Sequence, residues 1–235
     1  MDDKIIRRLG QRLNHIFQWI NSANTYSTIW DICCDHGRLG LHLHQRFPTT
    51  HIHLVDKVAS IINTLETDYA SLNDGRLHFI AADATRLSLP AEQRSLVIIA
   101  GVGGQNLQAI LKGIIDRLKK GSAVEFILSP NSHTFELRSF LREQHFTLIE
   151  ESFVTEKNFS HEHLWLRYHC GRSPAQLNTE SFQPVTIIGD SLWRDMSNIK
   201  RTYIHKLIRH YERMQANRDC PYAEVALNAY KKIIQ

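Results

Sequence analysis

The segment that most constrains the fold is Ile29–Leu43, with the sequence IWDICCDHGRLGLHL. An apolar run leads into a tight turn that carries Asp31, Asp35 and Gly37, and a helical pattern follows. A second apolar run, His53–Asp56, also ends in an acid. Nucleotide-type cofactor sites in α/β folds begin in this way, with a strand, a turn, a helix and a second strand that ends in an acid. The segment therefore predicts a ligand site at the carboxyl edge of a parallel sheet.

The rest of the chain alternates apolar runs with amphipathic stretches. The runs predict further strands over 77–81, 96–100, 124–128, 147–155 and 164–169, and the periodicity predicts helices over 3–21, 39–47, 58–72, 107–118 and 134–144. Alternating strands and helices indicate a parallel sheet, and the last two strands, which no helix separates, indicate an antiparallel hairpin at one edge.

The turn after the first strand distinguishes two ligand classes. A dinucleotide site would show G-x-G-x-x-G, whereas Cys33–Gly37 lacks two of those glycines. Acids suit a ligand with a ribose and an amine, because Asp56 can accept both ribose hydroxyl protons while Asp31 or Asp35 faces a cationic amino acid. S-adenosyl-L-methionine has this profile, so a methyltransferase is favoured over a dehydrogenase.

Several separated motifs carry a family resemblance over nearly the whole chain. They are Arg12-Leu13, the D-x-x-x-D-H of Asp31, Asp35 and His36, the I-A-G-x-G-G of Ile99–Gly104, and Pro130-Asn131. In this order they resemble the bacterial tRNA (adenine(22)-N1)-methyltransferase family. The resemblance implies a Rossmann-like class I methyltransferase sheet with an antiparallel terminal strand, S-adenosylmethionine as cofactor, tRNA as partner, and methylation of N1 of adenine 22. It also implies a C-terminal coiled-coil-like helical region that helps to grip tRNA.

The chain departs from the family pattern at several of these motifs. Cys33 stands where glycine is usual and Asp56 where glutamate is usual. The other departures are Ser129 before Pro130, Val102 within the glycine motif, and His161-Glu162 in the hairpin in place of a tyrosine-glutamate pair. These changes bear more on the identity of the target base than on cofactor binding.

The chemistry of adenine N1 directs the choice of catalytic residues. N1 already carries an in-plane lone pair, so alignment matters more than a strong base. We expect Asp35 to accept from the exocyclic amine and offset the charge that methylation creates, and Asn131 to hold the base. The expected cofactor-binding residues are Asp31, Cys33, His36, Gly37, Asp56, Lys57, Asp83, Ala84, Ala100, Gly101 and Gly103. Three simpler interpretations stay open: Asp35 and Asp83 as helix or turn caps, and Gly101–Gly104 as a helix start.

Basic residues gather near both ends of the chain, although the net charge is only +4. Expected RNA contacts are Arg7, Arg8, Arg12, Lys200, Arg201 and Arg209, since phosphates dominate affinity for RNA. Solvated helix faces are the alternative. The expected domains are a catalytic domain over 1–170, a linker over 171–188, and a helical hairpin over 189–235 with Asp190 as N-cap.

Composition excludes several protein classes. The acidic start and the absence of a run of roughly 18 apolar residues predict a cytoplasmic protein without a signal peptide or membrane span. Cysteines at 33, 34, 170 and 220 form no C-x-x-C pair, and the pairs His42/His44 and His51/His53 lack acidic support, so we expect no metal site. We expect a monomer. Two rival functions remain, a small-molecule methyltransferase and a non-catalytic RNA-binding protein on the same fold.

Overall fold

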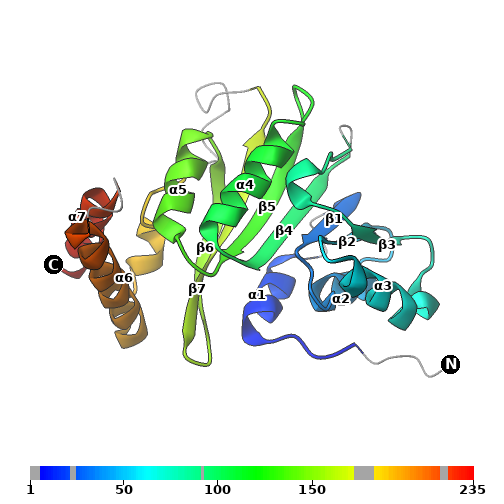
Figure 1. Cartoon of the computed structure of the whole chain (residues 1–235), viewed down its shortest axis with the longest axis horizontal. Coiled ribbons are helices and arrows are strands. Elements are labelled where there is room, and N and C mark those ends of the chain that lie inside the picture. The colour runs from blue at the N-terminus through cyan, green and yellow to red at the C-terminus, as the bar shows by residue number, and fades with distance from the viewer. Residues whose placement is uncertain (1–5, 22–24, 91–92, 172–182, 218–221) are drawn as a thin grey trace.

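The computed structural model describes residues 6–21, 25–90, 93–171, 183–217 and 222–235, which form one mixed sheet with helices on both faces (Figure 1). The strands are β1 (Thr28–Ile32), β2 (His51–Asp56), β3 (Leu77–Ala81), β4 (Ser95–Val102), β5 (Ala123–Pro130), β6 (Thr147–Glu156), β7 (Phe159–His169) and β8 (Gln183–Pro184). The α-helices are α1 (Gln11–Trp19), α2 (Arg38–Arg46), α3 (Ala59–Asp68), α4 (Gly104–Ile115), α5 (Thr134–Glu143), α6 (Asn198–Ala216) and α7 (Ala223–Ile234).

The strand order is β3-β2-β1-β4-β5-β7-β6-β8. The strands β1 to β5 pair in parallel, whereas β7 runs antiparallel to both β5 and β6. This confirms the predicted Rossmann-like sheet and its antiparallel hairpin. The hairpin is not outermost, because β8 pairs with β6 beyond it. The linker expected over 171–188 therefore contains a strand at Gln183–Pro184, and Val185 is buried in the core.

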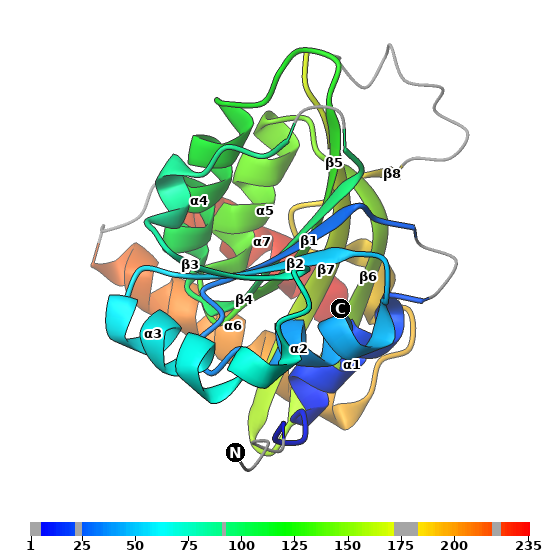
Figure 2. The ribbon, with the colours of Figure 1, turned by 90° about the vertical axis from the view of Figure 1, so that its right-hand side faces the viewer.

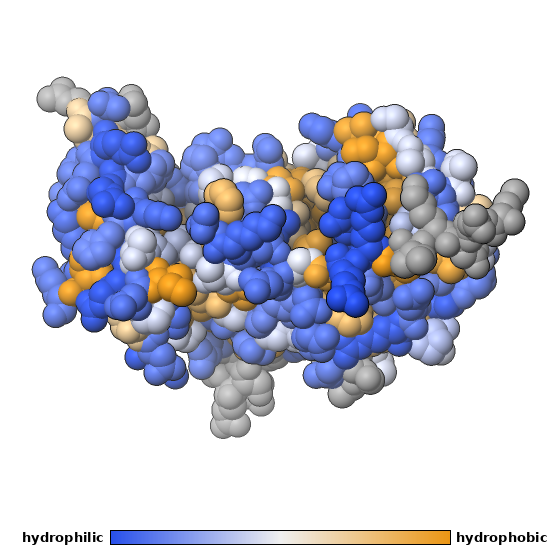
Figure 3. Space-filling model, turned by 90° about the horizontal axis from the view of Figure 1, so that it is seen from below, coloured by the Kyte–Doolittle hydropathy of each residue, from blue (hydrophilic) through white to orange (hydrophobic). Residues whose placement is uncertain are grey.

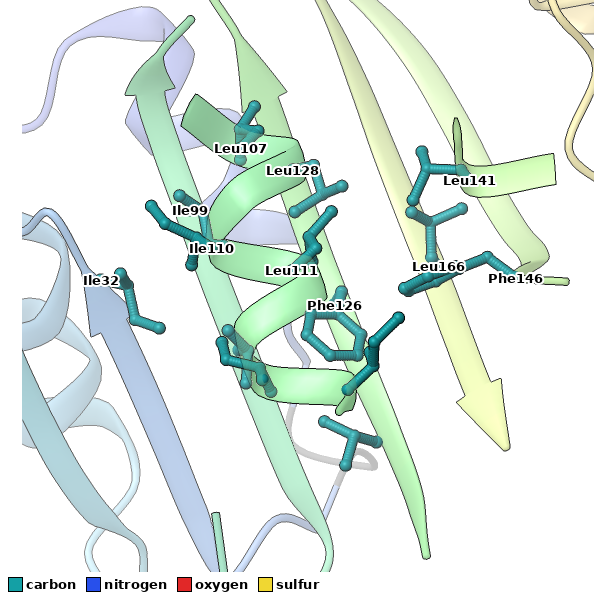
Figure 4. Packing of buried hydrophobic residues seen from close by; sticks show 14 of the residues in the cluster. Ile32, Ile99, Leu107, Ile110, Leu111, Phe126, Leu128, Leu141, Phe146 and Leu166 are labelled. Carbon is teal, nitrogen blue, oxygen red and sulfur yellow. The ribbon is translucent and has the colours of Figure 1, made fainter. Parts of the chain in front are cut away.

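Two hydrophobic cores cover the two faces of the sheet. One lies under α4 and α5, where Leu107, Ile110 and Leu111 of α4 pack on Ile99 of β4 and Leu128 of β5 (Figure 4). The other lies under α1, α2 and α3 on the opposite face (Figure 2). A central strand is buried on both faces, and β1 is buried at every position, which is why most of its residues are apolar. No described helix is both long and apolar enough to cross a bilayer.

The first helix is shorter than the predicted span of 3–21. Residues 1–5 lie outside the described residues, 6–10 are not helical, and α1 begins at Gln11. Gly10 is extended, and the Glu156 carboxylate occupies the space that a Cβ on Gly10 would need. Glu156 also accepts the backbone N–H of Arg12 at 3.4 Å. A carboxylate from the β6–β7 hairpin therefore sets where α1 begins.

The C-terminal region is a helical pair, α6 and α7, at the end of the molecule opposite α2 and α3 (Figure 1). The prediction that Asp190 caps the first helix was wrong, because Asp190–Trp193 is a 3₁₀ turn and the N-cap is Ser197, which accepts from the N–H of Lys200. An N-cap side chain accepts a hydrogen bond from a backbone N–H in the first turn of the helix, and the Ser197 hydroxyl does so. The pair packs on Phe135 of α5 and Phe153 of β6, so its core includes a residue of the sheet.

A buried ionic cluster joins this region to the hairpin. Arg138 of α5 is 0% exposed and donates to Glu162 of β7 and to Glu151 of β6, at 2.8 Å in each case. Tyr203 of α6 donates to Glu162 at 3.0 Å, and Ser191 donates to Glu151. Buried charges persist when they are paired and hydrogen bonded. The cluster fixes α6 against the strand that leads to the hairpin tip.

Candidate active site at the carboxyl edge of the sheet

The carboxyl ends of β1, β2 and β4 bring together residues that are far apart in sequence. β1 lies between β2 and β4, so Asp31 near the end of β1 lies beside both strands. Asp56 ends β2, and Gly101 lies near the end of β4. Ligands of doubly wound sheets bind at this edge, where the strand order changes direction.

The turn between β1 and α2 has an unusual backbone. Cys33, Asp35 and Gly37 all have positive φ, at 57°, 49° and 62°. Such values are uncommon outside glycine and concentrate at functional sites. Cys33 therefore has the left-handed backbone conformation that glycine adopts most readily. Gly37 is buried as the N-cap residue of α2, so its role here is to shape the turn.

Asp31 is the buried acid of the site. It is 5% exposed and accepts the backbone N–H of Gly40 at 2.9 Å. Burial, aided by the nearby charge of Asp56, raises the pKa of Asp31 to about 7. A Cβ on Gly40 would clash with the Leu54 side chain and lie 3.2 Å from the Asp31 carboxylate. Only glycine lets α2 approach the strand so closely.

A first hollow, which we name the Asp56 cavity, has a volume of about 420 Å³. Of the residues expected from the sequence to bind the cofactor, seven line this cavity: Cys33, Asp56, Lys57, Asp83, Ala84, Gly101 and Gly103. Asp56 accepts backbone N–H groups from Asp35 at 3.3 Å and Val58 at 3.0 Å, which fixes the carboxylate at the cavity wall. Asp83 accepts from the N–H of Thr85 at 2.9 Å, so it caps a turn and lines the cavity at once. Hydrogen bonds from Thr85 lower the pKa of Asp83.

A second hollow, the Asp31 cavity, has a volume of about 530 Å³. Of the site residues expected from the sequence, six line this cavity: Arg12, Asp31, Cys33, Asp35, His36 and Ala100. The Asp35 side chain is 69% exposed and its carboxylate lies 3.7 Å from His36. The tip of the hairpin, with Lys157 and Phe159, closes the other side of the cavity. The face that carries this hairpin tip is largely hydrophilic, with small hydrophobic patches (Figure 3).

The two cavities meet at two places on adjacent strands. Cys33, just after β1, lines both of them. On β4, Ala100 lines the Asp31 cavity and the next residue, Gly101, lines the Asp56 cavity. Burial raises the pKa of the Cys33 thiol to about 11, so this thiol is neutral near pH 7. The small neutral side chain of Cys33 therefore lies at the boundary between the two ligand-sized cavities.

Arg12 and Asn131 form a polar bridge beside Gly101. Asn131 donates its amide to the carbonyl of Gly101 at 2.7 Å and accepts from the Arg12 guanidinium at 3.3 Å. Burial lowers the pKa of Arg12, although the charge of Glu156 opposes that shift. Asn131 lines neither cavity, and its amide holds the backbone of β4 and the side chain of α1.

The predicted basic residues fall into two separate groups. Arg7 and Arg8 are exposed before α1, and Arg12 lines the Asp31 cavity. Arg201 and Arg209 are exposed and Lys200 is half-buried on α6, at the other end of the molecule (Figure 1). Among the described residues, no group of three or more His, Cys, Asp or Glu side chains has an arrangement that could hold a metal ion.

Some lining residues were not identified from the sequence. Asn106 and Ile110 of α4 line the Asp56 cavity, and His161 and Phe159 of the hairpin line the Asp31 cavity. Ile110 falls within the helix predicted over 107–118, and local periodicity does not place the hairpin tip beside the turn after β1. Gly40 lines neither cavity, but its position in α2 signals that the helix packs closely on the sheet, since a glycine inside a helix is costly unless something approaches it closely.

Comparisons with known proteins agree with this geometry. A family model described as a methyltransferase domain matches residues 9–164. A Mycoplasma pneumoniae protein, whose name assigns it provisionally as a tRNA methyltransferase, is 35% identical over 156 residues, which cover 65% of this chain and 67% of that protein. The B. subtilis m1A22 tRNA methyltransferase TrmK superposes with a TM-score of 0.72 at 19% identity, over 97% of this chain and 99% of that chain. M. capricolum TrmK in complex with S-adenosyl-homocysteine has a TM-score of 0.69 at 19% identity, over 96% of each chain.

Proposed function

Because the chain belongs to the methyltransferase family whose domain model matches residues 9–164, we propose that it transfers a methyl group from S-adenosylmethionine to N1 of an adenine in tRNA, with adenine 22 as the target. The observation that carries the proposal is the meeting of the Asp56 cavity and the Asp31 cavity at Cys33 and at Ala100-Gly101. A methyl donor in the first cavity and a base in the second would have their reacting groups at this junction.

The residues of the Asp56 cavity suit S-adenosylmethionine. The volume of the Asp56 cavity lies within the range of about 300–1,000 Å³ typical of small-molecule sites. Asp56 would accept the ribose hydroxyls, Asp83 the adenine amine, and Ile110 would pack on the adenine ring. The methionine end would extend past Cys33 to Asp31, which lines the second cavity, and its ammonium group would supply the countercharge that the buried Asp31 carboxylate lacks. When bound, S-adenosylmethionine supplies an electrophilic methyl group on its sulfonium centre.

The Asp31 cavity suits a base extruded from RNA. Enzymes that modify the pairing edge of a base take it out of the stack. The N1 lone pair forms the new bond to carbon while the carbon–sulfur bond breaks, and the methylated adenine gains a positive charge. Asp35 would accept a hydrogen bond from the exocyclic amine and stabilise that charge. Arg12 and Lys157, at the same cavity, would face the phosphates of the strand.

The tRNA substrate rests on three supports. The M. pneumoniae relative is named as a tRNA methyltransferase, the B. subtilis enzyme is an m1A22 tRNA methyltransferase, and basic residues of this chain occur both beside the cavity and on α6. The proposal needs neither a metal nor a membrane. A monomer working in the cytoplasm, where unmodified tRNA is met, is part of the proposal.

The test is methyl transfer to unmodified tRNA with labelled S-adenosylmethionine, followed by nuclease digestion and mass spectrometry. We expect 1-methyladenosine at position 22, and a kcat lowered about a hundredfold in Asp35→Asn with unchanged cofactor affinity, because the lost charge acts mainly on the product-like state. Asp116→Asn is the control, since that surface carboxylate pairs only with Lys112 among the described residues.

Other outcomes would identify the rival functions. Cofactor binding without label on any tRNA would point to a small-molecule acceptor. RNA binding without cofactor affinity would point to a non-catalytic protein on this fold. Label at another nucleotide would keep the reaction and change the target.

A further inference from the structure

A third hollow, the Arg7 cavity, lies next to the Asp31 cavity and has a volume of about 420 Å³. The turn residues Asp35 and His36 and the first residue of α2, Arg38, line both cavities. The far wall of the Arg7 cavity comes from α3 and from Tyr69, which follows it. The same turn therefore faces the proposed acceptor site on one side and this second space on the other.

Two arginines, Arg7 and Arg38, line the Arg7 cavity. Among the described residues, neither Arg7 nor Arg38 has an ion pair. The Nε atom of Arg38 is buried and has no hydrogen-bond partner there. A guanidinium without an ion-pair partner suits a phosphate oxygen, the acceptor that it binds best. Asp68, which also lines the cavity, already has an interaction of its own.

The wall opposite these cations suits a base. Ile61, Leu65 and Tyr69 line this wall, with Ile61 half-buried and the other two less than a tenth exposed, and Ser60 and Thr64 are exposed beside them. The Thr64 hydroxyl donates to the carbonyl of Ser60 at 2.8 Å. Cations along one side of a groove with apolar and aromatic surface on the other are the arrangement by which proteins hold single-stranded nucleic acid.

We propose that the Arg7 cavity binds the nucleotide adjacent to the acceptor adenine on the same RNA strand, with Arg7 and Arg38 on the phosphate between the two nucleotides. This rests on the proposed function, because it requires an RNA base in the Asp31 cavity. Since the two cavities share the turn Asp35-His36, an extruded adenine brings its neighbouring phosphate to Arg38. The site thereby selects a strand locally unstacked on one side of the target.

The test replaces, one at a time, the two phosphates that flank the target adenine by neutral methylphosphonates in tRNA assembled from synthetic segments. For the wild-type protein we expect KM for the RNA to rise about tenfold at one of the two positions, the cost of one charge-assisted contact. The Arg7→Gln, Arg38→Gln double variant should show a raised KM for normal RNA and no further rise with that methylphosphonate. Its salt dependence of RNA binding should also be less steep.

Two further variants separate this site from general effects. Thr64→Tyr fills the Arg7 cavity from α3 without lining the Asp31 cavity, and should raise KM for RNA while cofactor affinity stays unchanged. Lys119→Gln removes one exposed positive charge before β5, at the opposite edge of the sheet, and should change neither parameter.

The outcomes distinguish the two proposals. Methylation that is insensitive to both methylphosphonates, or a double variant as sensitive as the wild type, would overturn the inference and leave the proposed function intact. A wild-type protein that methylates no adenine in tRNA would overturn the proposed function and this inference together.

Discussion

The buried cluster around Arg138 gives the sharpest stability prediction. Replacing Arg138 by Met removes the cation that lies between Glu151 and Glu162, whose side chains are 2% and 0% exposed. Breaking a buried ion pair by removing one partner costs about 3–5 kcal/mol, because a buried charge is left unpaired. At roughly 2–4 °C per kcal/mol for a chain of this size, the variant should melt roughly 6–20 °C lower.

The loss should depend on pH in a defined direction. Burial raises the pKa of Glu162, and the Arg138 charge opposes that shift, so removing Arg138 raises the pKa further. A carboxyl whose folded pKa lies above its unfolded value near 4.3 keeps a proton in the folded state, and stability then falls as pH rises towards the folded pKa. The variant should therefore lose more stability at pH 8 than at pH 5.

Urea unfolding at both pH values measures this effect. The compensated triple variant Arg138→Met, Glu151→Gln, Glu162→Gln should recover much of the lost free energy of unfolding, since it leaves none of the three charges of this cluster. A single Arg138→Met variant within about 1 kcal/mol of the wild type at pH 8 would refute the reasoning, because both carboxylates would then have found another partner or solvent.

Two other predictions concern titration of buried groups. Because burial raises the pKa of Asp31 to about 7, wild-type affinity for S-adenosylmethionine should weaken by up to about tenfold per pH unit below that value. Calorimetry should find a weaker affinity in Asp31→Asn, and that affinity should change less with pH. His163 is 0% exposed, and burial lowers its pKa to about 3, so its contribution to stability is lost as pH falls from about 6.5 towards 3. In His163→Leu, the difference in free energy of unfolding between pH 7 and pH 5 should shrink by roughly 2 kcal/mol, and an unchanged difference would contradict it.

The sequence was most informative where a local pattern determines the structure. The buried strand at Thr28–Ile32, the turn with Asp35 and the acid that ends β2 were all predicted, because each follows from residues within one short segment. The helix start at Gln11 was not, because it depends on Glu156, which is 144 residues away from the N–H of Arg12 that it accepts. Contacts of that separation leave no local pattern.

The candidate site shows the same division between local and distant determinants. Asp31, Cys33 and Asp56 were placed correctly at one edge, since parallel strands bring their carboxyl ends together. We expected Asn131 to hold the base, but it lines neither cavity. Its side chain bonds instead to Arg12 of α1 and to the carbonyl of Gly101. The hairpin wall of the Asp31 cavity depends on the antiparallel pairing of β6 and β7, which local periodicity does not position against β1.

Alternation along β7 lets one strand serve two parts of the molecule. Successive side chains of a strand point to opposite faces, so His161 lines the Asp31 cavity while Glu162 faces Arg138 and Tyr203. The basic face of α6 is thereby held at a fixed position relative to the cavity, across the width of α5 and the hairpin. An RNA that contacted both groups of cations would have to extend from the Asp31 cavity past the hairpin to α6.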